Sequence, residues 1–186
     1  MYERIYAAYG SNMDETQMKR RCPKAELVGR GEVVGLHLLF KGSGSGVYAT
    51  LEEAKDFIGM QNRVPVILWS ITPQDEKALD RYEGFPHFYY KQDICLDHVA
   101  WCRPSKRAIR LYETPSFDME GKYVLDEDVK ISVAVGMAYI MHEDRLLGRP
   151  GKEYYRLLRR AYERFMFDTS ILDAAVRFSG NHEGEV

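Results

Sequence analysis

The chain has 186 residues and a formal net charge of −2, and 45% of its residues are hydrophobic. This length and composition are typical of one soluble globular domain with a substantial core. The small net charge excludes the basic field that attracts nucleic acid or anionic lipid, and no apolar run reaches the roughly 20 residues that span a membrane. We therefore expect neither nucleic acid nor a membrane among the partners.

The N-terminus and the cysteines favour a cytoplasmic location. Residues 1–4 lead straight into a strand-like segment and lack the apolar stretch of a signal peptide. Cys22, Cys95 and Cys102 are odd in number and form no Cys-x-x-Cys pair, which favours reduced thiols over a disulfide framework or a zinc site. The histidines are not spaced as a metal-binding pair on a helix, so no metal site is predicted.

Apolar patterning and turn residues predict several strands and three separate helices. Strands are predicted at residues 5–9, 25–40 (one or two strands with bends or bulges at the glycines), 47–51, 63–71, 89–98 and 131–141. Helices are predicted at residues 14–21, 73–83 and 153–167. The Gly/Ser run at 42–46 is expected to form a loop or a hairpin connection. Residues 101–130 are the least legible part of the chain, and we expect a hairpin around 109–113.

The helix at residues 73–83 has the clearest boundaries. Thr72 is a good N-cap, and Pro73 suits the first helical position. Gly84 stands at the C′ position, where helices commonly end. Glu83 is therefore predicted in the last turn of this helix.

The order of the elements predicts an α+β fold. Strands come first, short helices are isolated among them, and one longer helix follows, which favours a mixed sheet or barrel with peripheral helices over a regularly alternating parallel sheet. No repeat of 20 to 50 residues is present. We expect residues 1–180 to form a single domain and residues 181–186 to be a disordered tail.

A strand-turn-helix junction at Tyr9 to Met13 is a candidate binding element. Backbone N–H groups in such a turn lack internal partners, and with the positive end of the helix they suit a carboxylate or an oxyanion. Gly10 permits close approach of a ligand, while Ser11 and Asn12 add side-chain donors. The alternative is a structural turn in which Asn12 is a plain N-cap.

Glu83 is a candidate general acid or base. In the last turn of its helix it faces the negative end of the helix dipole, at a cost of about 0.3 to 1 kcal/mol. Dipole and burial would both raise its pKa toward the working pH, as acid/base catalysis requires. The aromatic residues close to it in sequence are Tyr82, Phe85, Phe88, Tyr89 and Tyr90. The alternative is a surface glutamate paired with Arg81 or Lys91.

The last predicted helix carries a basic face. Its arginines are Arg156, Arg159, Arg160 and Arg164. Such a charge run is most often a solvated surface, and with a net charge of −2 it does not indicate nucleic-acid binding.

Five blocks, in order along the chain, resemble the γ-glutamylcyclotransferase family. The first, at residues 6–13, reads Tyr-Ala-Ala-Tyr-Gly-Ser-Asn-Met and is similar to the opening signature of that family. The block at 79–86, Leu-Asp-Arg-Tyr-Glu-Gly-Phe-Pro, resembles the one that holds its catalytic glutamate. The remaining blocks are residues 21–25 with 35–40, residues 136–141, and Pro150 with Tyr154. Met13 departs from the usual Leu of the signature, and Val66 from a frequent Gly.

The resemblance implies a small mixed β-barrel with helices outside it and a cavity at one end. It implies that a γ-glutamyl α-amine attacks its own γ-carbonyl, so that 5-oxoproline forms and an amine or amino acid leaves, with no metal or cofactor. Glu83 would be the catalytic acid/base. The substrate-binding residues would be Tyr9, Gly10, Ser11, Asn12, Tyr90 and Tyr139, although Tyr90 and Tyr139 have plain packing as an equal alternative.

Two other functions stay open at the level of sequence. One is hydrolysis of a γ-glutamyl conjugate, in which water replaces the substrate's own amine. The other is a catalytically silent member that binds a small carboxylate or a partner protein. For the enzyme the expected ligand is a small-molecule γ-glutamyl substrate, and the chain is expected to be a monomer or a homodimer.

Overall fold

The structure is a computed structural model that describes residues 4–43, 46–53, 62–102, 116–117, 123–124 and 134–185. Its strands are β1 (Arg4–Ala8), β2 (Glu26–Val34), β3 (Leu36–Ser43), β4 (Gly46–Glu53), β5 (Arg63–Ile71), β6 (Tyr89–Trp101), β7 (Ser116–Phe117), β8 (Tyr123–Val124), β9 (Ala134–Met141) and β10 (Leu146–Leu147). Its helices are the 3₁₀ turn η1 (Ser11–Met13), α1 (Glu15–Arg21), α2 (Pro73–Glu83), α3 (Lys152–Arg164) and α4 (Thr169–Asn181). The predicted hairpin at 109–113 lies outside the described residues.

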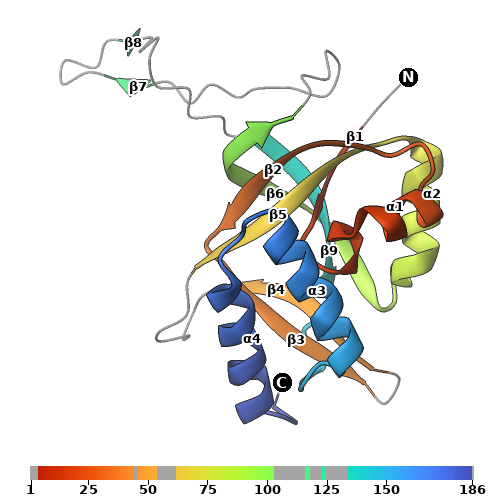
Figure 1. Cartoon of the computed structure of the whole chain (residues 1–186), viewed down its shortest axis with the longest axis vertical. Helices are drawn as coiled ribbons and strands as arrows, with labels where there is room; N and C mark the ends of the chain where they lie inside the picture. The colour runs from red at the N-terminus through yellow and green to blue at the C-terminus, as the bar shows by residue number, and fades with distance from the viewer. Residues whose placement is uncertain are drawn as a thin grey trace.

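Five strands close into a barrel in the order β1-β5-β2-β6-β9. Neighbouring strands are antiparallel except β1 and β9, which run parallel and pair at Tyr6 and Met137. A smaller sheet, β10-β3-β4, lies beside the barrel, and β7 pairs with β8. Figure 1 shows α1 and α2 on one side of the barrel and α3 and α4 over β3 and β4. The mixed barrel with peripheral helices confirms the predicted α+β fold class.

Glycines shape β2, as the sequence predicted. The pairing register shifts between Leu27 and Gly29 against β5, and a second shift follows against β6. A Cβ at Gly29 would lie 2.7 Å from the Ala100 carbonyl oxygen, so only glycine allows this close approach of β6. Gly35, at φ +83, then separates β2 from β3. The bends let β2 pair with strands on both of its sides.

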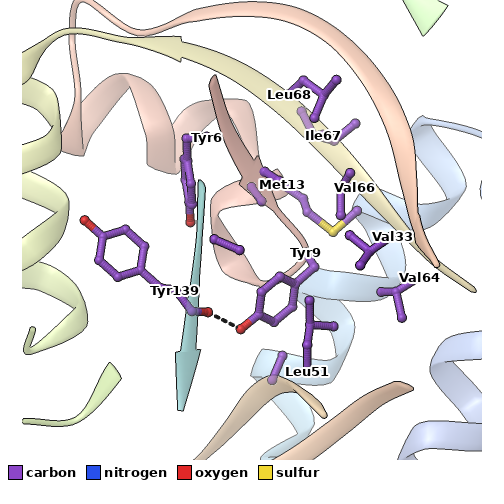
Figure 2. Packing of buried hydrophobic residues seen from close by; sticks show 14 of the residues in the cluster. Tyr6, Tyr9, Met13, Val33, Leu51, Val64, Val66, Ile67, Leu68 and Tyr139 are labelled. Atoms are coloured by element: carbon purple, nitrogen blue, oxygen red, sulfur yellow. Dashed lines mark hydrogen bonds between the residues drawn. The ribbon is translucent and has the colours of Figure 1, made fainter. Parts of the chain in front are cut away.

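The core lies inside the barrel and anchors the turn that follows β1. Met13, the last residue of η1, is fully buried, and so is Val66 of β5. Figure 2 shows the Met13 side chain reaching toward Val66. Burial of a methionine side chain contributes about 1.5 to 3 kcal/mol. This packing holds η1 at the end of the barrel.

The boundaries of α2 match the prediction. Thr72 accepts a hydrogen bond from the Asp75 N–H and Asp75 accepts one from the Thr72 N–H, which is a capping box. Gly84 ends the helix in the left-handed conformation at φ 67. Leu79 is fully buried and fixes the helix against the barrel. The helix therefore presents its last residue, Glu83, at a defined place.

The C-terminal part of the chain differs from the prediction. The helix expected at 153–167 ends at Arg164, and a further helix, α4, follows. Ser179 of α4 accepts a hydrogen bond from the Phe40 N–H at 2.9 Å, which joins α4 to β3. We expected the last residues of the chain to be disordered. The backbones of residues 184 and 185 instead form hydrogen bonds with the backbone of Leu147. None of the helices in the described ranges is long and apolar enough to cross a membrane.

The Gly/Ser run forms part of a hairpin. β3 and β4 are antiparallel partners over their whole length, and Ser43 pairs with Gly46. Residues 44 and 45 lie outside the described residues. Of the two alternatives expected at 42–46, a loop or a hairpin connection, the structure shows the hairpin connection.

Candidate active site

A cavity of about 440 Å³ lies at the end of the barrel where β1 and β9 finish and β6 begins. This volume is within the range of small-molecule sites. The cavity also reaches η1, β4, the end of α2 and the start of α3. Its wall is mostly aromatic, and the aromatic residues are Tyr6, Tyr9, Tyr48, Tyr82, Phe88, Tyr89, Tyr139 and Tyr154.

The turn at Gly10, Ser11 and Asn12 forms one side of the cavity. Hydrogen bonds from the Met13 N–H to the Gly10 carbonyl (3.0 Å) and from the Asp14 N–H to the Ser11 carbonyl (3.1 Å) close the turn. These bonds use the N–H groups of residues 13 and 14, so those of residues 10–12 take no part in closing it. The turn can therefore direct amide hydrogens toward a ligand.

Asn12 is not the N-cap of α1. The structure gives that role to Asp14, whose carboxylate accepts a hydrogen bond from the Gln17 N–H at 2.9 Å. Asn12 is instead 2% exposed, and its backbone carbonyl accepts a hydrogen bond from the Trp69 indole N–H at 3.0 Å. Its side chain is left to form polar contacts inside the cavity, so the alternative of Asn12 as a plain cap is wrong.

Glu83 joins the turn across the cavity. The Asn12 Nδ2 donates to Glu83 Oε1 at 2.8 Å and to the Tyr6 hydroxyl at 2.9 Å. Lys91, which we had considered as a surface partner of Glu83, instead contacts Glu76 and Asp80. The carboxyl group that ends α2 thus lies beside the turn that ends β1.

Burial raises the pKa of Glu83 from 4.5 to about 7, and the Arg21 charge and the Asn12 hydrogen bond limit the rise. The residue is half-buried overall, but its carboxyl group lies inside the cavity. Hydrogen bonds to neutral groups hold Arg21 near Glu83: it donates to Asn12 Oδ1 and, at 3.1 Å, to Ser11 Oγ. A carboxyl with a pKa near 7 can both take and return a proton at neutral pH.

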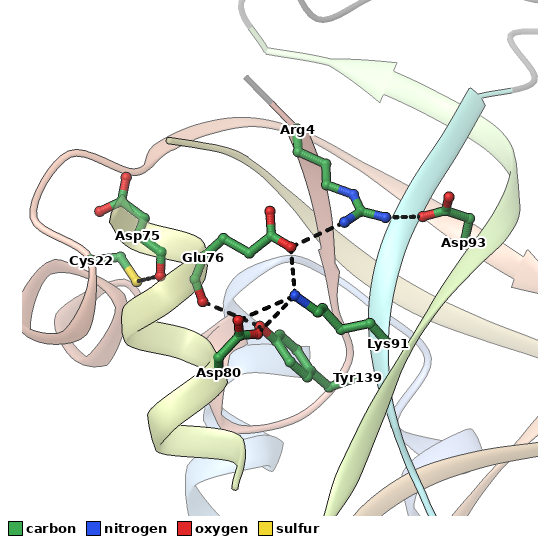
Figure 3. A network of polar contacts seen from close by, with 8 residues as sticks. All are labelled: Arg4, Cys22, Asp75, Glu76, Asp80, Lys91, Asp93 and Tyr139. Atoms are coloured by element: carbon green, nitrogen blue, oxygen red, sulfur yellow. Dashed lines mark hydrogen bonds and ion pairs between the residues drawn. The ribbon is translucent and has the colours of Figure 1, made fainter. Parts of the chain in front are cut away.

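Tyr9 and Tyr139 both line the cavity, as predicted. The Tyr9 hydroxyl donates to the Tyr139 carbonyl, as Figure 2 shows. The Tyr139 hydroxyl donates to Asp80 Oδ1 at 2.6 Å, one turn before Glu83 on α2. In Figure 3, Lys91 bridges Asp80 and Glu76, with contacts of 3.1 and 2.8 Å. This network ties α2 to β6 and β9.

The structure places Tyr90 apart from the other predicted substrate-binding residues. Tyr90 does not line the cavity, and its ring lies 5.3 Å from that of His142. Tyr89 lines the cavity instead, and its hydroxyl donates to the Ala49 carbonyl at 2.9 Å. Adjacent side chains of a strand point to opposite faces, so only one of these two neighbours can face the cavity.

The sequence interpretation missed Arg21, Tyr48 and Tyr154 as site residues. The Tyr154 hydroxyl accepts a hydrogen bond from the Ala49 N–H at 3.3 Å and lies close to Gly10. Arg21 and Tyr154 stand within blocks that carry the family resemblance, which was the available signal. Tyr48 is in β4 and had no such signal. In the described part of the chain, no group of three His, Cys, Asp or Glu side chains could hold a metal ion.

Fold and cavity together define a small-barrel protein with a ligand-sized site. A family model described as gamma-glutamyl cyclotransferase, AIG2-like, matches residues 6–128, which is more than half of the 186 residues. The chain therefore belongs to the AIG2-like gamma-glutamyl cyclotransferase family. No curated protein sequence matches the chain.

Several solved structures share the fold. One titled "Gamma-glutamyl cyclotransferase" is 17% identical with a TM-score of 0.57, and the match covers 88% of this chain and 80% of that one. An uncharacterized protein from Homo sapiens is 17% identical with a TM-score of 0.59 and the same coverage of 88% and 80%. YkqA from Bacillus subtilis is 15% identical with a TM-score of 0.59, and the match covers 100% of this chain but 57% of YkqA. At these identities the likeness shows the fold alone.

Proposed function

We propose that the protein is a γ-glutamyl cyclotransferase, which converts a γ-glutamyl compound into 5-oxoproline and a free amine or amino acid. The observation that carries the proposal is the position of the Glu83 carboxyl, which lies in the same cavity as the turn at residues 10–12 and 2.8 Å from Asn12 Nδ2. Family membership supports the same reaction.

The turn would bind the γ-glutamyl part of the substrate. A γ-glutamyl group carries an α-carboxylate, an α-ammonium and a γ-carbonyl oxygen, so it needs donors for two oxygen centres and an acceptor for the ammonium. The N–H groups of residues 10–12 can supply donors, and they can also stabilise the negative charge that develops on the carbonyl oxygen. Glu83 is the acceptor. The turn is held by Trp69 and Met13, so little motion is required of it.

Glu83 would move the protons of the reaction. As a carboxylate it removes a proton from the α-ammonium, and the free amine then attacks the γ-carbonyl carbon and forms the ring C–N bond. The carboxyl group returns that proton to the leaving nitrogen as the original amide C–N bond breaks. The ring nitrogen loses its second proton as the released amine becomes an ammonium, so Glu83 ends in its starting state. Its pKa of about 7 suits both transfers.

The aromatic wall would shape the site and limit water. Tyr6, Tyr9 and Tyr89 are buried around the carboxyl group. Exclusion of water favours attack by the substrate's own amine, which is already held close to the carbonyl carbon. This arrangement supports cyclisation over hydrolysis.

The experiment is product analysis with a panel of γ-glutamyl amines and γ-glutamyl amino acids. We expect 5-oxoproline and the matching free amine in equal amounts from at least one substrate. Glu83→Gln should lower the rate by orders of magnitude, because the amide cannot accept the proton. Glu153→Gln, whose side chain is 84% exposed on α3, is the matched control and should keep the rate.

Three other results would contradict the proposal. Free glutamate in place of 5-oxoproline would mean that water is the nucleophile and that the protein is a hydrolase. Saturable binding of γ-glutamyl compounds in a thermal-shift assay, with no turnover of any of them, would mean a silent binding protein. A Glu83→Gln variant as fast as the wild type would remove Glu83 from the chemistry.

A further inference from the structure

A second cavity, of about 490 Å³, forms a groove between α1 and α3. We call it the arginine groove, and its lining residues are Asp14, Thr16, Gln17, Arg20, Arg21, Leu157 and Arg160. Its lining residues differ from those of the candidate active site, although Arg21, which lines the groove, also donates to Ser11 and Asn12 of the active-site turn. Figure 1 shows α1 and α3 on either side of the chain segment that contains η1.

The pairing of the arginines on α3 singles out Arg160. Arg156 contacts Glu153, Arg159 contacts Glu163, and Arg164 contacts Glu15 of α1. Among the described residues Arg160, which faces the groove, forms no ion pair. Three of the four arginines of this exposed face are therefore paired within the described residues, and the fourth faces the groove.

The opposite wall of the groove repeats this feature. Arg20 of α1 also forms no ion pair within the described ranges, and it is exposed. Among the residues that the structure describes, Arg21 donates to neutral groups alone, those of Ser11, Asn12 and Tyr82. Asp14, the acidic residue among the described residues that line the groove, is already the cap of α1.

The charge of the lining residues favours an anionic ligand. Three guanidinium groups and one carboxylate leave the groove with a net charge of +2. Guanidinium groups bind phosphate oxygens through paired, charge-assisted hydrogen bonds. We propose that the arginine groove binds a phosphate dianion, either inorganic phosphate or the phosphate group of a small phosphomonoester, through Arg20 and Arg160.

The test is a titration of the protein with inorganic phosphate, followed by thermal unfolding, against sodium chloride at matched ionic strength. A ligand that binds only the folded state raises the melting temperature in a saturable way. The test variant is Arg20→Gln/Arg160→Gln. Arg156→Gln, on the same helix but outside the groove, is the control. Arg21 is left unchanged because it also holds the active-site turn.

We expect phosphate to stabilise the wild type and the control more than chloride does, and the double variant to bind phosphate about tenfold or more weakly. An equal phosphate response in the double variant, or a wild-type response no larger than that to chloride, overturns the proposal. If the double variant does not fold, Arg160→Gln alone replaces it, with a smaller loss of affinity expected. Glycerol phosphate, titrated in parallel, distinguishes a phosphomonoester site from one that accepts only the free ion. This readout needs no enzyme activity, so it is independent of the proposed function.

Discussion

Replacing Glu83 by glutamine should change how the stability of the fold depends on pH. In the folded protein burial holds the pKa of Glu83 at about 7, against 4.5 for the solvated group. Between these two pH values the folded state keeps a proton that the unfolded chain has lost. Stability therefore falls as pH rises through this window, and the full penalty is present above pH 7. Glutamine has nearly the same shape and no proton to lose, so the variant escapes the penalty.

The size of the effect follows from the two pKa values. Each pKa unit corresponds to about 1.4 kcal/mol, so the whole window is equivalent to about 3.5 kcal/mol. Between pH 5 and pH 8.5 the free energy of unfolding of Glu83→Gln, relative to the wild type, should rise by about 2.5 kcal/mol. The variant should thus be the more stable protein at alkaline pH, and its advantage should shrink to about 1 kcal/mol at pH 5.

Urea denaturation at the two pH values measures this difference. Glu153→Gln on the exposed face of α3 provides the control, and its free energy of unfolding relative to the wild type should stay within about 0.5 kcal/mol at both pH values. If the Glu83→Gln variant likewise shows no pH-dependent difference, the carboxyl group is solvated. The description of an enclosed carboxyl with a raised pKa would then be refuted.

Three further changes test the site. Arg21→Gln removes a charge that lowers the pKa of Glu83. The midpoint of the pH-rate profile should therefore move up by roughly half a pH unit or more. An unchanged midpoint would show that the Arg21 charge does not influence the pKa of Glu83. Tyr139→Phe removes the hydroxyl that donates to Asp80. The free energy of unfolding, measured by urea denaturation, should fall by about 0.5 to 1.5 kcal/mol. An unchanged free energy of unfolding would mean that this hydrogen bond does not stabilise α2. Gly10→Ala places a Cβ in the cavity, 3.3 Å from the Tyr154 hydroxyl. We expect KM to rise about tenfold while the fold stays intact. Equal KM values for the variant and the wild type would show that the turn does not contact the substrate.

Local signals in the sequence were sufficient for the elements that carry the candidate site. Thr72, Pro73 and Gly84 each have a backbone role that depends on only a few neighbouring residues, so the bounds of α2 could be predicted. The glycines of β2 could be predicted as bends for the same reason. Because Glu83 directly precedes Gly84, its place at the end of α2 followed as well.

Tertiary contacts decided the rest. Which of Tyr89 and Tyr90 faces the cavity depends on the register of β6 in the barrel, and no local pattern sets that register. Arg21 reaches the turn only because α1 folds back over η1. The helix α4 had a local signal, since Asp168 caps it and its buried residues Leu172 and Ala175 are three apart. Helix α4 could therefore have been predicted from the sequence, although it was not.

The most direct test of the account is the pH dependence of kcat/KM for 5-oxoproline formation, measured for the wild type and for Glu83→Gln. We expect the wild-type rate to rise with pH through a midpoint near 7, where Glu83 becomes ionised, and the residual rate of the variant to lack this step. A wild-type profile with no ionisation near pH 7, or the same profile in the variant, would contradict the assignment of Glu83 as the group that moves the proton.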